Sequence, residues 1–179
     1  MRLFFGLSLP PDVRAATAAY ARRAAQCVPG RYALPDNHHI TLAFLGEVPP
    51  EREGEARAVL SGCAAAFPAP QVTIVGPSHF GREENAIFTL RAESEPPLDP
   101  LHAALTDALG AAGLPFDPGP FSPHVTLARH AKLSGADVPP FEPVRFTAAR
   151  AALFLSARDG TDVLRYTERF WAGFGKDQL

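Results

Sequence analysis

The sequence predicts an α+β fold of two pseudo-symmetric lobes, each a short and largely antiparallel sheet with helices outside, with a groove between the lobes. Short strand-like runs are mixed with helix-like runs, which is typical of this class. Near the end of the chain, Asp159-Gly160 separates two apolar runs and indicates a hairpin. The stretches HHITLAF (38–44) and HVTLAR (124–129) repeat His, Thr, Leu and Ala at the same relative positions, each after a helix-like run, which indicates an internal repeat.

The first part of the chain predicts two strands, at residues 2–8 and 38–45, and two helices, at residues 12–27 and 51–66. Pro11 suits the first turn of the first helix, because a proline there lacks only an N–H that would have no partner. Gly30 follows the end of that helix, and Phe67-Pro68 stops the second one. Each strand is therefore followed by a helix.

The second part predicts strands at residues 71–76, 85–91 and 123–129, a helix at 101–113, and a closing hairpin of 149–157 with 163–171. A loop through His79, Phe80, Gly81 and Arg82 is expected between the first two of these strands. A proline-rich break at 96–100 precedes the helix, Gly113 ends it, and a polar loop of Gly and Pro residues fills 132–143.

The composition is that of an ordinary soluble protein. The 179 residues suit a single bilobal domain spanning 1–179. The hydrophobic fraction is 46%, the charged fraction is 20% and the formal charge is −2, which excludes a disordered or strongly basic chain. Contact with nucleic acid is therefore expected to be local, and not a general attraction to phosphates.

The compartment follows from cysteine usage and from the first residues. Cys27 and Cys63 lie in apolar helix-like runs and indicate neither a disulfide framework nor a metal site, so the cytoplasm is expected. The start, MRLFFGLSLPPD, has a short apolar stretch but no small-residue cleavage site, and we interpret it as a first strand and not a signal peptide. No run is as long as a membrane span, so no membrane partner is expected.

The two repeated strands carry the candidate site. Because side chains alternate along a strand, the His and Thr of each repeat face one way and the apolar residues face the other: Ile40 and Leu42, and Val125 and Leu127. If the lobes face each other, His39, Thr41, His124 and Thr126 share a polar cleft. Two imidazoles near neutral pH suit general acid-base catalysis, and the hydroxyls suit binding of phosphoryl oxygens.

Arg129, just beyond the second repeat, could add a planar cationic group for the same anion. In a regular strand it would point to the side of Val125 and Leu127, away from the cleft. We therefore expect Arg129 to reach the cleft only if the strand ends or bulges after Leu127.

The other four histidines suit structural positions. His38 faces away from His39, His102 falls in the third helix, and His79 and His130 fall in loops, so all four are expected to be surface or partly buried residues. They form no metal-binding spacing, and no phosphate-binding glycine loop, Gly-x-Ser-x-Gly elbow or cysteine nucleophile is found.

Over nearly its whole length the sequence resembles the 2H phosphoesterases, and within them the RNA 2′,3′-cyclic phosphodiesterases, also called LigT-like 2′-5′ RNA ligases. MRLFFGLSLP resembles the first strand of that family, RYALPDNHHITLAFLGEV and FSPHVTLAR its two motifs, and LFLSARDGTDVLRYTERF its closing hairpin. Three positions depart from the family pattern: Tyr32 replaces a common tryptophan, Asp36 a glutamate and His38 an aliphatic residue.

The resemblance implies metal-free and cofactor-free hydrolysis of an RNA 2′,3′-cyclic phosphate end to a 2′-phosphate end, by a monomer. It implies that His39 and His124 are the acid-base pair. Of the two assignments, we expect His39 to protonate the leaving oxygen and His124 to activate water, and the symmetry of the two motifs leaves the reverse assignment open. It further implies that Thr41 and Thr126 hold the phosphate, that Arg129 assists, and that 2′-5′ ligation is the reverse reaction. Tyr32, Phe80 and Phe121 could stack on the terminal base, although core packing suits most aromatic residues.

Two alternatives remain open from the sequence. The same two-histidine chemistry could act on small nucleotides bearing a 2′,3′-cyclic phosphate, or on an ADP-ribose cyclic phosphate, in place of RNA 3′ ends. A module that only binds phosphorylated RNA ends, without catalysis, would belong to another class. Such a binder would not need two titrating groups, which argues for the enzyme.

Overall fold

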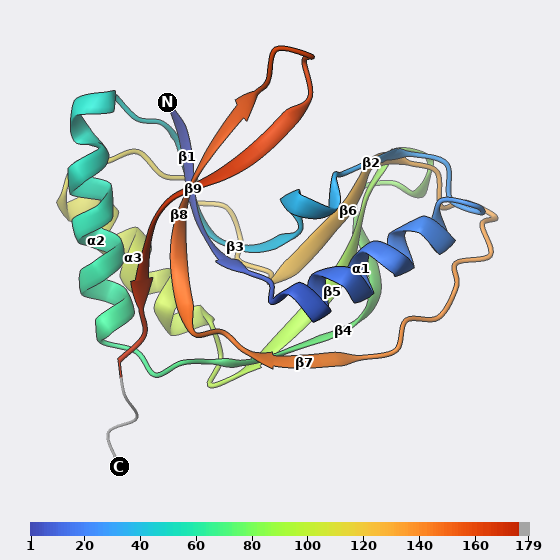
Figure 1. Cartoon of the computed structure of the whole chain (residues 1–179), viewed down its shortest axis with the longest axis horizontal. Coiled ribbons are helices and arrows are strands. Elements are labelled where there is room, and N and C mark those ends of the chain that lie inside the picture. The colour runs from blue at the N-terminus through green and yellow to red at the C-terminus, as the bar shows by residue number, and fades with distance from the viewer. Residues whose placement is uncertain (176–179) are drawn as a thin grey trace.

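The protein folds as one curled antiparallel sheet with three α-helices packed against it, as the computed structural model of residues 1–175 shows (Figure 1). The helices are α1 (Pro11–Ala24), α2 (Glu53–Ala65) and α3 (Asp99–Ala111). The strands are β1 (Arg2–Ser8), β2 (Arg31–Tyr32), β3 (His39–Glu47), β4 (Gln71–Phe80), β5 (Ala86–Glu95), β6 (His124–Ala131), β7 (Val144–Thr147), β8 (Arg150–Arg158) and β9 (Leu164–Gly173).

The two repeated strands, β3 and β6, lie side by side in the middle of this sheet. The strand order is β7-β4-β5-β6-β3-β1-β8-β9, and the short β2 pairs with β6. We call β3, β1, β8 and β9 the His39 half, and β6, β5, β4 and β7 the His124 half. One residue pair, Ile40 with Val125, joins the halves. The predicted α+β class and antiparallel pairing are confirmed, but the two expected sheets form one continuous sheet.

Two of the helices, α1 and α3, are exchanged between the halves. Helix α1 precedes β3 in the chain, yet it packs on the His124 half, where the Tyr20 ring lies 6.4 Å from Phe88 of β5 (Figure 1). Helix α3 precedes β6, yet it packs on the His39 half, where the His102 ring hydrogen-bonds the carbonyl oxygen of Leu42 at 2.7 Å. Helix α2 packs beside α3 on the same half, and its Glu53 accepts a hydrogen bond from Arg169 of β9 at 3.1 Å. Helices α1 and α3 thus each cover the half that contains the other repeat, whereas α2 packs on the half that contains β3, the strand it follows in the chain.

Burial follows the predicted alternation in the central strands. Ile40, Leu42, Val125 and Leu127 are all buried on the side that faces the helices. A second, smaller cluster of Phe4, Ala152 and Phe154 is buried on the opposite face of the His39 half. No helix among residues 1–175 is both long enough and apolar enough to cross a bilayer.

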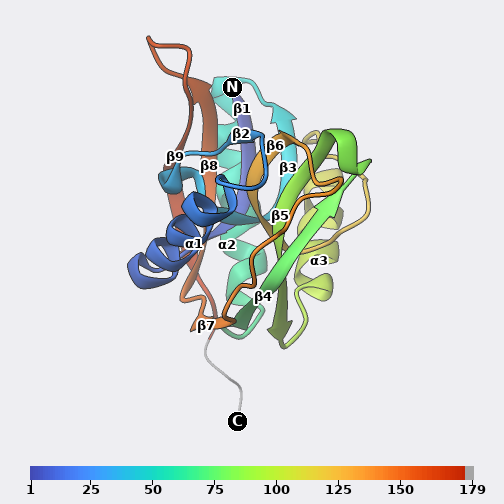
Figure 2. The ribbon, with the colours of Figure 1, turned by 90° about the vertical axis from the view of Figure 1, so that its right-hand side faces the viewer.

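Several predicted element boundaries are wrong. The first helix ends at Ala24 and not at residue 27. His79 and Phe80 lie in β4 and not in a loop, because the β4–β5 ladder continues through the pairs His79–Phe88 and Phe80–Ile87. His130 lies in β6 and not in a loop, with a left-handed φ of 53°. The β8–β9 hairpin is confirmed, and it projects beyond the rest of the sheet (Figure 2).

Candidate active site

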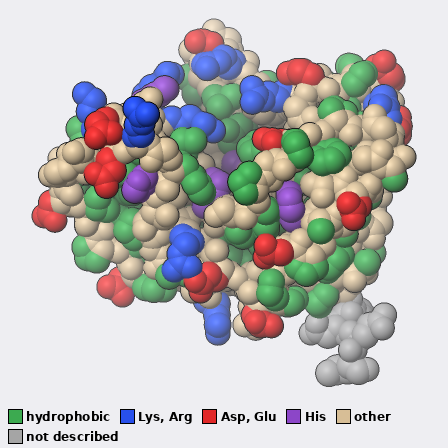
Figure 3. Space-filling model, turned by 180° about the vertical axis from the view of Figure 1, so that it is seen from behind, with side chains coloured by type: hydrophobic (Ala, Val, Ile, Leu, Met, Phe, Trp, Pro, Cys, Tyr) green, Lys and Arg blue, Asp and Glu red, His purple; other side chains and the backbone are tan. Residues whose placement is uncertain are grey.

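The pairing of β3 with β6 brings the four repeated polar residues together. Ile40 lies opposite Val125, so in the same register His39 lies across from Thr126 and Thr41 across from His124. All four side chains are half-buried on the face opposite to Ile40 and Val125. The arrangement that the sequence predicted for His39, Thr41, His124 and Thr126 is therefore present in the folded chain. Figure 3 shows histidine side chains in a hollow near the middle of this face, below a group of Lys and Arg side chains.

Both histidines present the same nitrogen to the cleft. The Nδ1 atom of His39 lies 2.7 Å from the carbonyl oxygen of Asn37, and that of His124 lies 2.7 Å from the carbonyl oxygen of Ser122. A carbonyl oxygen only accepts hydrogen bonds, so Nδ1 carries the proton in both rings. In the neutral ring Nε2 is then a bare acceptor, and the hydroxyl of Thr41 donates to Nε2 of His39 at 2.9 Å.

Both imidazoles are neutral at pH 7 in the free protein. Burial lowers the pKa of His39 to about 4, against the bond to Asn37 that raises it, and a proton on the neighbouring His124 lowers it further. Burial also lowers the pKa of His124, against its bond to Ser122, and Arg129 adds a further lowering. A bound anion would raise both pKa values, because it stabilises the protonated ring.

Aromatic rings surround the two histidines. Phe4 lies 4.7 Å from the His39 ring, and Tyr166 meets that ring edge-on at 5.0 Å. Phe80 meets the His124 ring at 4.9 Å in a T-shaped contact. The sequence prediction named Phe80 but missed Tyr166, which the β8–β9 hairpin brings to His39 from far along the chain.

Gly6 of β1 allows the close approach of β3 behind His39. A Cβ at this position would lie 2.8 Å from the carbonyl oxygen of Ile40 and 3.4 Å from Cδ2 of His39. A side chain on Gly6 would therefore displace the strand that carries His39.

A β-bulge in β6 turns Arg129 toward the cleft. Thr126 pairs with Thr89, but Ala128 pairs with Phe88, so Leu127 is an extra residue in the ladder. Ala128 consequently faces the core, and Arg129 is exposed on the other face. The bulge that the sequence prediction required for Arg129 is confirmed, and it lies at Leu127 itself.

Strand β3 has the same bulge at the matching position. Thr41 pairs with Gly6 and Ala43 with Phe5, so Leu42 is the extra residue. Ala43 is buried and Phe44 is 41% exposed. Phe44 is therefore the counterpart of Arg129, because each follows its histidine by the same number of residues. The sequence prediction missed Phe44, although the alignment of the two repeats already paired it with Arg129.

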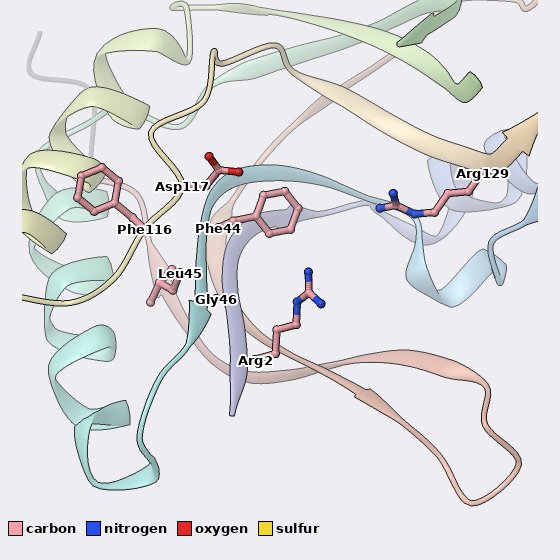
Figure 4. Close-up of a pocket in the computed structure, with 7 residues that line it drawn as sticks. All are labelled: Arg2, Phe44, Leu45, Gly46, Phe116, Asp117 and Arg129. Atoms are coloured by element: carbon pink, nitrogen blue, oxygen red, sulfur yellow. The ribbon is translucent and has the colours of Figure 1, made fainter. Parts of the chain in front are cut away.

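A cavity of about 430 Å³ opens between Phe44 and Arg129. Arg2, Leu45, Gly46, Phe116 and Asp117 complete its lining (Figure 4). Arg129 connects this cavity to the histidines, since its charge acts on His124. The sequence prediction named neither Arg2 nor Asp117, and no local pattern marks either residue.

The remaining histidines lie outside the cleft. His38 is buried, which corrects the expectation of a surface or partly buried residue: the turn Pro35–Asn37 directs it onto α1, where Nδ1 lies 2.9 Å from Thr17 Oγ1. His102 is half-buried and stacks on Phe121 with ring centroids 4.3 Å apart, whereas His79 and His130 are exposed. Among residues 1–175, no group of three or more His, Cys, Asp or Glu side chains is placed to hold a metal ion.

The chain is similar to known proteins over most of its length. A family model described as the 2′-5′ RNA ligase superfamily matches residues 9–138. An RNA 2′,3′-cyclic phosphodiesterase of Escherichia coli K12 is 32% identical over 178 residues, which cover 96% of each chain. One of Geobacillus stearothermophilus is 30% identical over 151 residues, 83% of this chain and 47% of the relative. The alignment thus spans about half the length of the Geobacillus relative.

The fold agrees with these matches. The crystal structure of E. coli LigT complexed with NADP+ superposes with a TM-score of 0.77 at 27% identity and covers 98% of each chain. LigT has also been crystallised with phosphate and with 3′-AMP.

Proposed function

The chain belongs to the 2′-5′ RNA ligase superfamily, and we propose that it hydrolyses RNA 2′,3′-cyclic phosphate ends to 2′-phosphate ends by metal-independent two-histidine catalysis. The observation that carries this proposal is the pair of unprotonated Nε2 atoms on the neighbouring strands β3 and β6, each set by an Nδ1–H bond to a backbone carbonyl. Its relatives are RNA 2′,3′-cyclic phosphodiesterases, which act on this kind of end.

The reaction exchanges one P–O bond for another. A water oxygen attacks phosphorus while the bond from phosphorus to the 3′-oxygen breaks, and the 2′-oxygen keeps the phosphate. His124 Nε2 accepts the proton of the water, and a protonated His39 Nε2 donates a proton to the leaving 3′-oxygen. The same steps with an RNA 5′-hydroxyl in place of water as the attacking group give 2′-5′ ligation: the 5′-oxygen bonds to phosphorus, the bond to the 3′-oxygen breaks, and the reversal of this step cleaves the 2′-5′ bond.

The acid must gain its proton in the complex. Both histidines are neutral at pH 7 in the free protein, because burial lowers both pKa values. The negative charge of the cyclic phosphate raises the pKa of any imidazole that it contacts. Substrate binding therefore supplies the protonation state that catalysis needs.

The threonines and Arg129 hold the phosphate. Thr41 already donates its hydroxyl to His39 Nε2, and this hydroxyl can turn to a phosphoryl oxygen when the substrate displaces it. Thr126 lies across from His39 in the same register. Arg129 faces the cleft after the bulge and offers a planar pair of donors.

The first test is incubation of EDTA-treated protein with a short RNA that ends in a 2′,3′-cyclic phosphate. The expected product is the 2′-phosphate, formed at the same rate after chelation. A 3′-phosphate product would mean that the other P–O bond breaks. Binding without turnover would favour a module that only binds RNA ends, and turnover of mononucleotides alone would favour the small-nucleotide reading.

A second test separates the acid from the base. A substrate with sulfur in place of the bridging 3′-oxygen has a leaving group that needs no protonation. Activity of His39→Ala should recover on this substrate, and that of His124→Ala should not. Recovery of His124→Ala alone would reverse the two roles.

Compartment and assembly follow from the same proposal. We expect the protein to act as a monomer, because one chain supplies both histidines. We expect it in the cytoplasm, because Cys27 and Cys63 indicate no disulfide framework. Size-exclusion chromatography with light scattering measures the assembly, and a stable dimer would contradict this expectation.

A further inference from the structure

The cavity beside the histidines combines an open aromatic face with charges of both signs. Phe44 is 41% exposed, and Arg2, Arg129 and Asp117 line the same hollow (Figure 4). Phe4 links Phe44 to the acid-base pair, with its ring 5.7 Å from Phe44 and 4.7 Å from His39. A group bound on Phe44 is therefore separated from His39, and so from the reacting phosphate, only by the ring of Phe4.

The charged groups of this cavity are not neutralised by ion pairs. Among residues 1–175, no salt bridge joins Arg2, Arg129 or Asp117 to each other or to another side chain. Arginines next to a phosphate site need no special explanation. A carboxylate in the same place does, because it repels the phosphate that the arginines attract.

The position of Asp117 is set by its own backbone. Its N–H donates to the carbonyl oxygen of Phe44 at 2.9 Å, so the residue is held against the bulged part of β3. Its Oδ1 accepts the N–H of Gly119 at 2.9 Å, which fixes the side chain in a turn. Oδ2 and the second lone pair of Oδ1 remain for a ligand near the Phe44 ring.

We propose that this cavity holds the terminal nucleobase of the substrate and selects guanine, with Asp117 as the specificity-determining residue. The inference rests on the proposed function, because the base must belong to the nucleotide whose phosphate reacts. Guanine presents two adjacent donors, N1–H and the N2 amino group, which match a carboxylate. It also presents the acceptors O6 and N7, which match an arginine such as Arg2. Phe44 stacks on the base and contributes to the binding of every base.

The other bases fit Asp117 less well. Adenine and cytosine each present one amino donor beside a ring nitrogen that repels a carboxylate. Uracil presents one N–H between two carbonyl oxygens. Only guanine offers two adjacent donors that the two oxygens of one carboxylate can accept together.

The test compares four short RNAs that end in a 2′,3′-cyclic phosphate and differ only in the last base. We expect kcat/KM to be about tenfold higher for guanine than for adenine, a modest value for one carboxylate contact. Asp117→Asn should reduce this ratio to about one, because an amide no longer accepts from both guanine donors and can pair with adenine instead. Asp137→Asn removes an exposed aspartate outside the cavity and should leave the ratio unchanged.

Binding of 2′-GMP and 2′-AMP, measured by calorimetry, gives a readout without turnover. Tighter binding of 2′-GMP that is lost in Asp117→Asn supports the inference even if the chain fails to hydrolyse any cyclic phosphate. Equal kcat/KM and equal binding for the two bases, or a guanine preference that survives Asp117→Asn, would overturn it while the proposed hydrolysis stands.

Discussion

At the residue scale, the orientation of each histidine depends on the residues just before it. The ring donates Nδ1–H to the carbonyl oxygen two positions earlier, at Asn37 and at Ser122. This bond is local, because donor and acceptor are only two residues apart. It forms when the segment before the strand places the carbonyl oxygen next to Nδ1. The segments before the two strands differ in sequence: one is Pro35–Asn37 and the other ends in Pro123. Both nevertheless place a carbonyl oxygen where the histidine Nδ1–H can donate to it.

The first prediction concerns these two rings. His39→Ala and His124→Ala should each lower kcat/KM by about 10²–10⁴, because each removes one proton transfer. His79→Ala is the matched control, since His79 is exposed and lies outside the cleft. The pH profile of the unsubstituted protein should be bell-shaped. Variants within tenfold of the unsubstituted rate, or a flat profile between pH 5 and 9, would contradict the acid-base assignment.

A second prediction concerns stability, and it belongs to His38. Burial lowers the pKa of this ring to about 4, and nearby Arg14 lowers it further against Asp36, while its buried Nε2 has no partner within residues 1–175. The unfolded chain takes up a proton near pH 6.5, and the folded chain does so only near pH 4. The contribution of neutral His38 to the free energy of unfolding is therefore fully present above pH 6.5. This contribution is lost as the pH falls toward 4, and the loss is at most roughly 3 kcal/mol.

The substitution His38→Gln keeps a donor for Thr17 and removes the titration. Urea unfolding of both proteins at pH 7 and pH 4.5 measures the difference, and the variant should lose less stability between the two values. His39 adds a similar slope in both proteins, so the comparison isolates His38. Equal losses would mean that the buried ring does not set this dependence.

At the element scale, the paired bulges of β3 and β6 shape the cleft. Each bulge leaves a leucine carbonyl outside the regular ladder, and each carbonyl has its own partner. The N–H of Ala33 donates to the oxygen of Leu127 at 2.8 Å, and the ring of His102 donates Nδ1–H to the oxygen of Leu42 at 2.7 Å. The side chain of His102 thus stabilises the bulge of β3, and the backbone amide of Ala33 stabilises the bulge of β6.

The prediction at this scale concerns His102. His102→Ala leaves the carbonyl oxygen of Leu42 without its donor, which costs about 1–3 kcal/mol, and it loosens the bulge that turns Phe44 to the cleft. We expect a lower Tm and a higher KM with kcat nearly unchanged. His102→Asn keeps an N–H donor and should restore KM. A normal KM in His102→Ala would show that the bulge holds without this bond.

At the scale of the whole molecule, the exchanged helices tie the two halves together. Helix α1 comes between strands of the His39 half in the chain but packs on the His124 half. Neither half can therefore keep its core when the other unfolds. We predict one cooperative transition, in which fluorescence of Trp171, the single tryptophan, and far-UV circular dichroism change together.

Amide exchange offers a second measurement of this coupling. The central amides of β5 and β8, one strand from each half, should exchange with the same free energy of opening. Two separate denaturation midpoints, or much weaker protection of one strand, would mean that the halves unfold independently.

The alternation of polar and apolar residues was predictable because it depends on neighbours in the chain. Ile40 and Val125 are buried and His39 and His124 face the cleft, as period-2 geometry requires. The closing hairpin was predictable from its turn residues. Short edge strands such as β7 were not, because four residues gain their structure only by pairing with β4.

The sequence by itself determined the repeated His-x-Thr strands, their polar face and the chemistry that two imidazoles can perform, because these follow from side-chain identity and local geometry. Only the tertiary structure decided which strands pair, where the bulges fall, which helix covers which half, and that Asp117 and Arg2 meet beside Phe44. The physical reason is that a bulge or a cavity is a relation between segments far apart in the chain. Its position depends on the packing of both segments, which no local pattern records.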